Sequence, residues 1–79
     1  MSVEITLDMA AEKDALKVTR IIGKGKARLR LLQMGITPGT PIEVLRRAPL
    51  ADPVEIAVRG AKLALRQEEA KNIAVVKEG

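Results

Sequence analysis

Short alternations of apolar and polar residues recur along the chain, and this pattern is typical of half-buried β-strands. We predict strands at residues 16–22, 42–47, 54–59, 62–66 and 73–76, with a short strand or extended lead-in over 3–9. A helical period replaces the alternation over 26–34, where Ala27, Leu31 and Met34 would share one face of a short helix. Residues 67–71 are polar and long enough for a single helical turn before the last strand.

The links between these elements carry clear turn signals. Gly35 suits the left-handed position after the helix, and Ile36 would then pack back on Leu31, as in a Schellman ending. Thr37-Pro38-Gly39-Thr40 predicts a type II turn, and Gly60 predicts a tight hairpin between the strands on either side of it. Ile21 and Ile22 alternate out of phase, which indicates a bulge at that point.

About five short strands in 79 residues predict a mainly β fold, a small partly open barrel whose curvature hides most of the sheet edges. The short helix would lie between the first and second long strands. We expect one domain over 1–79, because a chain of this size cannot divide its core. Its predicted core residues are Ile42, Val44, Val54, Ile56, Val58, Leu63, Leu65, Ile73 and Val75.

Composition excludes several kinds of function. The chain has no Cys, no His and no aromatic residue, so thiolate or imidazole metal sites and base-stacking platforms are missing. The same absence leaves no recognisable acid–base pair, and we expect no enzyme activity. The net charge of +4 and a pI near 9.9 favour an acidic partner. With no apolar run of membrane length and no signal-peptide pattern, we expect a cytoplasmic protein without membrane insertion.

Several segments, in their order and spacing, resemble one known family. These are Arg28 to Thr40 (RLRLLQMGITPGT), Ala48 to Ile56 (APLADPVEI), Arg59-Gly60 and Leu63 to Arg66 (LALR). Together they resemble FeoA proteins, the small cytoplasmic partners of the ferrous iron transporter FeoB, over about residues 7–76. The chain departs from the family pattern at Ala51, where Gly is common, and at Lys13-Asp14, where Pro-Gly is common.

The resemblance implies an SH3-like barrel and a role in bacterial ferrous iron uptake. The expected function is that of a non-catalytic accessory or regulatory protein docking on the cytoplasmic side of FeoB, a membrane protein with a cytoplasmic GTPase domain. Similar domains form the C-terminal part of iron-dependent repressors, and an iron-sensing domain of that kind is the alternative that the resemblance implies. The initiating Met and the absence of a DNA-binding part favour a free-standing protein.

The candidate partner-binding residues fall in a loop and in the predicted helix. Leu50 lies at the tip of a proline-stiffened loop, where it would either cap the barrel or contact a partner. Arg47 and Asp52 flank this loop, and at least one of Arg46 and Arg47 should be exposed. Basic residues gather near the helix, where a solvated face and a binding patch are both open interpretations. The complete candidate set is Lys26, Arg28, Arg30, Arg47, Leu50 and Asp52.

Three alternatives to simple docking remain open at this level. Asp52 and Glu55 could hold Fe²⁺ weakly in a metal-sensing domain, although we expect no cofactor and no dedicated metal site. A nucleic-acid-binding barrel would show affinity that falls steeply with salt. One of the arginines could also stabilise the phosphoryl group transferred by a partner GTPase.

Overall fold

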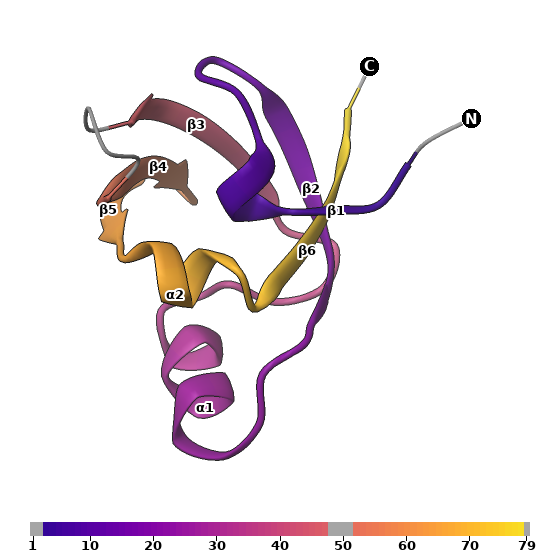
Figure 1. The fold of residues 1–79 in the computed structure, drawn as a ribbon, viewed down its shortest axis with the longest axis vertical. Helices are drawn as coiled ribbons and strands as arrows, with labels where there is room; N and C mark the ends of the chain where they lie inside the picture. The colour runs from indigo at the N-terminus through magenta and orange to yellow at the C-terminus, as the bar shows by residue number, and fades with distance from the viewer. Residues whose placement is uncertain (1–2, 48–51, 79) are drawn as a thin grey trace.

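The described residues, 3–47 and 52–78 of a computed structural model, form one antiparallel sheet in the order β1-β6-β2-β3-β4-β5 (Figure 1). The sheet curls on itself, with β1 and β5 at its two edges. Its strands are β1 (Ile5–Thr6), β2 (Ala15–Ile21), β3 (Pro41–Arg47), β4 (Val54–Val58), β5 (Ala61–Leu65) and β6 (Ile73–Lys77). A 3₁₀ helix, η1 (Leu7–Met9), follows β1, while helix α1 (Gly25–Gln33) follows β2 and α2 (Gln67–Ala70) follows β5. The predicted mainly β fold is confirmed.

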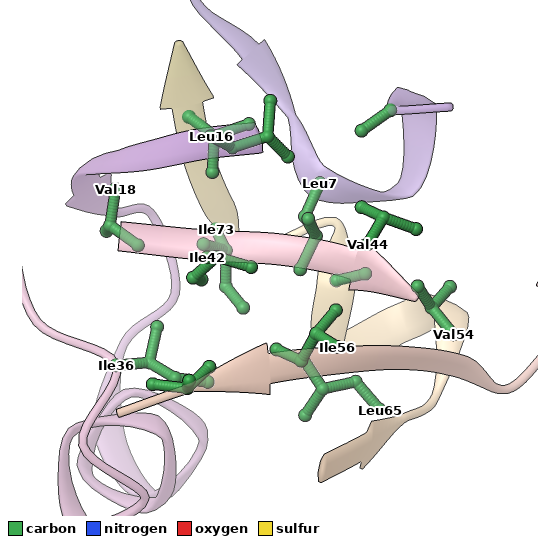
Figure 2. Close-up of a cluster of buried hydrophobic side chains, with 14 of the residues drawn as sticks. Leu7, Leu16, Val18, Ile36, Ile42, Val44, Val54, Ile56, Leu65 and Ile73 are labelled. Carbon is green, nitrogen blue, oxygen red and sulfur yellow. The ribbon is translucent and has the colours of Figure 1, made fainter. Parts of the chain in front are cut away.

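One aliphatic core fills the inside of the curled sheet (Figure 2). Side chains from β2, β3 and β4 meet Leu7 of η1, Leu31 of α1 and Ile36 there. Eight of the nine predicted core residues are buried, and Leu63 is half-buried against the same cluster. Alternation of apolar and polar residues therefore located the core correctly, because each strand has only one face against it.

The passage from α1 to β3 follows its turn signals closely. Gly35 has a φ of 87°, and the amides of Gly35 and Ile36 donate to the carbonyls of Leu32 and Leu31 at 3.0 and 3.1 Å. This pair of bonds is the Schellman ending. Gly39 has a φ of 89°, and the Thr40 amide donates to the Thr37 carbonyl at 3.0 Å, which confirms the predicted type II turn.

The β4–β5 hairpin is tied to this passage by one arginine. Arg59 and Gly60 both have positive φ, 50° and 79°, as a two-residue type I′ hairpin requires. The Arg59 guanidinium donates to the Gly35 carbonyl and to the hydroxyls of Thr37 and Thr40. Most of the residues that carry the sequence resemblance in this region thus hold the chain's own turns in place.

The N-terminal segment differs from its prediction. Instead of one short strand or extended lead-in over 3–9, the chain makes a two-residue strand and then η1. In a strand Leu7 and Met9 would lie on the same face, but a 3₁₀ helix turns about 120° per residue and separates them. Leu7 is fully buried, whereas Met9 is 72% exposed.

Two smaller predictions, the position of the bulge in β2 and the burial of Ala27, also differ from the structure. The bulge in β2 lies between Val18 and Arg20 rather than at Ile21, and it brings Val18 and Ile21 to the same buried face. Ala27 is exposed, because the first turns of α1 project beyond the barrel, and Leu31 is the buried residue of this helix.

No helix in residues 3–47 and 52–78 is both long enough and apolar enough to cross a membrane.

Candidate partner-binding site

The predicted contact residues lie in two separate regions of the molecule. Lys26, Arg28 and Arg30 belong to α1, which lies at one end of the long axis in Figure 1. Arg47 ends β3 and Asp52 precedes β4, toward the other end of that view. Leu50 lies outside the described residues, so its role stays a prediction. The structure therefore divides the candidate set into a helix surface and a loop surface.

Two of the three helix cations also anchor α1 to the body of the protein. Arg28 donates from Nη1 to the Ile21 carbonyl at 3.1 Å. Arg30 pairs through Nε with Glu69 Oε2 of α2 at 3.3 Å. Within the described part of the chain, neither Lys24 nor Lys26 has an ion pair or a side-chain hydrogen bond. These lysines leave their charge available to a partner.

The charge of the whole protein is concentrated in the segment that contains α1. Residues 15–42 include six Lys and Arg side chains and no Asp or Glu. The rest of the chain has eight Lys and Arg residues and ten Asp and Glu residues. Its net charge is therefore −2, compared with +6 for this segment. Electrostatic attraction of an acidic partner would therefore act mainly on β2, α1 and the link between them, which hold all six cations.

One cation of this segment, Arg20, is paired with Glu4, which precedes β1. Glu4 accepts a hydrogen bond from the Thr19 hydroxyl at 2.7 Å and pairs with the Arg20 guanidinium at 3.1 Å. The Thr19 hydrogen bond first, and then Arg20, hold the pKa of the Glu4 carboxyl below its usual value. Arg20 consequently contributes less than Lys24 and Lys26 to the field at the surface.

Arg47 has a structural role that the sequence did not reveal. Its guanidinium donates to the carbonyls of Ala10, Asp8 and Leu7 at 2.6, 2.8 and 3.0 Å. Its backbone amide donates to Glu12 Oε2 at 2.8 Å. Of the two neighbouring arginines, Arg46 is exposed and Arg47 is half-buried. Contact between Arg47 and a partner stays a prediction, and such contact would compete with the bonds that hold η1.

Asp52 is also engaged inside the protein. Its Oδ1 accepts from the Gln67 amide at 3.0 Å, which satisfies a free N–H at the start of α2. Asp52 lines an open hollow of about 240 Å³ together with Arg66, Gln67, Glu68 and Lys71. Side chains of both signs surround this hollow, so it favours no particular ion.

The described residues contain no cluster of three or more acidic side chains that could hold a metal ion. Asp52 and Glu55, the pair considered for Fe²⁺, are therefore not joined by a third carboxylate within residues 3–47 and 52–78. Hard divalent cations are usually held by several oxygen ligands, so this part of the structure offers no support for the metal-sensing alternative.

Comparison with known proteins decides the family. A family model described as the FeoA domain matches residues 5–77. The chain belongs to the FeoA family. FeoA domains are small accessory domains and are not a known enzyme family.

A curated relative carries this domain inside a much longer protein. It is an Fe(2+) transport protein A/Fe(2+) transporter FeoB fusion protein of Porphyromonas gingivalis, 39% identical over 62 residues. The match includes 78% of this chain and 7% of the relative, so this FeoA-family chain corresponds to a small part of that protein.

Solved structures show the same fold. An FeoA-like protein from Clostridium acetobutylicum superposes with a TM-score of 0.87 at 39% identity, over 95% of this chain and 87% of that one. Stenotrophomonas maltophilia FeoA, described as an SH3 domain protein, gives a TM-score of 0.80 at 23% identity, over 90% and 88% of the two chains. The expected SH3-like fold is confirmed.

Sequence reasoning missed one residue of the helix surface. Leu29 is 54% exposed on α1, and it was not singled out among the candidates. Helical spacing could have found it, because Leu29 is two residues from the buried Leu31 and two residues correspond to about 200° around a helix. A leucine so placed must face away from the core.

Proposed function

We propose that this FeoA-family protein is a non-catalytic accessory or regulatory protein of ferrous iron uptake, and that it docks on the cytoplasmic side of an FeoB-type transporter. The observation that supports this most strongly is the P. gingivalis relative, whose name joins transport protein A and FeoB in one chain. Covalent linkage holds two domains at an effective concentration of about millimolar. Such linkage favours domains that act together, and separate chains would need an interface to do the same.

The charge distribution supports docking by the helix surface. Lys26, Arg28 and Arg30 lie in the segment with a net charge of +6, and this segment would steer the protein to an acidic face of the transporter. Arg47, Leu50 and Asp52 are the proposed second contact region. Because Arg47 and Asp52 are bonded internally, their contribution would come with a local rearrangement.

The side chains available support the proposed non-catalytic role. The sequence has neither His nor Cys, so the commonest proton-transfer and nucleophilic groups are missing. The proposed action is therefore on the transporter, through binding, and not on a substrate of the protein's own.

Co-purification tests this proposal. The tagged protein would be produced together with the FeoB-type transporter of the same organism and isolated from detergent-solubilised membranes at low salt. We expect the transporter to elute with the tagged protein, and to be lost as salt is raised, because surface charges are screened. An unrelated SH3-like domain with the same tag is the control. A transporter that elutes equally with this control, or with neither protein, contradicts the proposal.

A further inference from the structure

Helix α1 projects from the body of the protein (Figure 1). Every residue from Gly25 to Arg30 is exposed, and only Leu31 is buried along the helix. Leu29 is 54% exposed, although burial of a leucine is normally favourable. The helix therefore presents an apolar side chain to the solvent among the cationic side chains of the same helix.

The exposed leucine lies within a continuous stripe on the outer side of the helix. Lys26, Leu29, Arg30 and Gln33 are spaced i, i+3, i+4 and i+7, so their side chains are neighbours along one face. Leu31 lies about 200° around the helix from Leu29, which places this stripe opposite the core. The outer face of α1 thus consists of one apolar group between cationic and amide side chains.

Arg28 and Arg30 anchor α1, but the lysines at the start of the helix do not stabilise it. Lys24 is the N-cap residue and makes no capping hydrogen bond with its side chain, and the first turn contains no acidic residue. Positive side chains near a helix N-terminus oppose the helix dipole, and acidic ones would be favourable there. A charge arrangement that is locally unfavourable is expected where a binding function selects it.

We propose that the outer face of α1 (Lys26, Leu29, Arg30 and Gln33, with Lys24 beside it) docks against an acidic protein surface that has an apolar pocket for Leu29. This inference rests on the proposed function, since the partner would be the FeoB-type transporter. Leu29 is the anchor, and the lysines select and orient the partner by charge.

Two other acidic partners fit this face less well. A membrane surface is bound by helices that bury a broad apolar face, and α1 offers a single exposed leucine along nine residues. Nucleic acid phosphates would use the cations but leave Leu29 without a function, and the chain has no aromatic residue for base stacking. An acidic protein surface uses both components of the stripe.

Binding of variants to the full-length transporter in nanodiscs of neutral lipid tests the inference. We expect Leu29→Ser and Lys26→Glu each to raise the dissociation constant about tenfold or more, because a few anchor residues usually supply most of the binding energy of an interface. The matched controls are Val3→Ser, at a more exposed apolar residue, and Lys62→Glu, at an exposed lysine outside the acid-free segment. Both controls should bind within about twofold of the wild type.

The folding of each variant would be checked by thermal unfolding, because Leu29 and Lys26 are exposed and their replacement should leave stability nearly unchanged. If the wild type binds the transporter and both α1 variants bind it as tightly as the wild type does, the inference is wrong while the proposed function stands. If the wild type does not bind the transporter, both are wrong. Binding to phosphatidylglycerol vesicles that depends on Leu29 and Lys26, without such dependence for the transporter, would also overturn the inference.

Discussion

Replacing Arg47 by Met should destabilise the fold strongly. The change removes three hydrogen bonds to the carbonyls of Leu7, Asp8 and Ala10 while keeping an unbranched side chain of similar length. These bonds join residues 37 to 40 positions apart, so they hold η1 and the N-terminal segment against the end of β3. Leu7 of η1 is fully buried, and loosening η1 would expose part of the core.

The size of the effect follows from the number and burial of these bonds. A hydrogen bond to a charged group contributes about 1.5–3 kcal/mol, and three fully buried ones would exceed the total stability of a small domain. Arg47 is half-buried, so water can replace part of what is lost. We therefore expect the free energy of unfolding to fall by about 2–3 kcal/mol. With a urea m-value of about 1 kcal/mol/M, the midpoint would fall by about 2–3 M.

Urea unfolding followed by far-ultraviolet circular dichroism is the assay, because the chain has no aromatic residue for intrinsic fluorescence. Arg46→Met is the matched control, since Arg46 is exposed on the neighbouring position, and it should change stability by less than about 0.5 kcal/mol. Arg47→Lys should fall between the wild type and Arg47→Met, because an ammonium cannot reach all three carbonyls in the same way. Equal midpoints for Arg46→Met and Arg47→Met would refute the structural role of Arg47.

Two further predictions concern the helix ending and the N-terminal strand region. Gly35→Ala should lower the free energy of unfolding by about 1–2 kcal/mol, because φ is 87° there and a residue with a Cβ is strained in this left-handed conformation; an unchanged urea midpoint would contradict this. Glu4 should titrate below the usual pKa of a glutamate in an NMR pH titration, because Thr19 and Arg20 stabilise its charged form. Since the folded pKa is lowered, this contact stabilises the fold above the unfolded pKa and is lost as the pH falls through the folded one; Glu4→Gln should lack that acid-dependent component.

Local signals in the sequence predicted much of the fold because the relevant interactions are local. The ending of α1 depends on Gly35, which can adopt positive φ, and the following turn depends on Pro38 and Gly39, which favour a type II geometry. Alternation in the strands identified the core face because the side-chain period of a strand is two.

Long-range contacts explain what the sequence could not show. The Arg47 guanidinium donates to carbonyls about forty residues away in sequence. Nothing in the sequence around Arg46 and Arg47 distinguishes the arginine with these partners from its exposed neighbour. The change from strand to η1 likewise depends on these bonds and on the burial of Leu7. In the candidate site, the clustering of cations was visible in the sequence, whereas the internal bonds of Arg28 and Arg30 and the exposure of Leu29 needed the folded chain.

The central claim, that this protein docks on an FeoB-type transporter, is tested most directly by nuclear magnetic resonance. The ¹⁵N-labelled protein would be titrated with the unlabelled cytoplasmic GTPase domain expected in the matching transporter, and backbone amide shifts would be followed to saturation. We predict shifts concentrated between Lys24 and Gln33 and in the second contact region of Arg47, Leu50 and Asp52, with little change in β5. A spectrum that stays unchanged with this domain, and again with the full-length transporter, would contradict the claim.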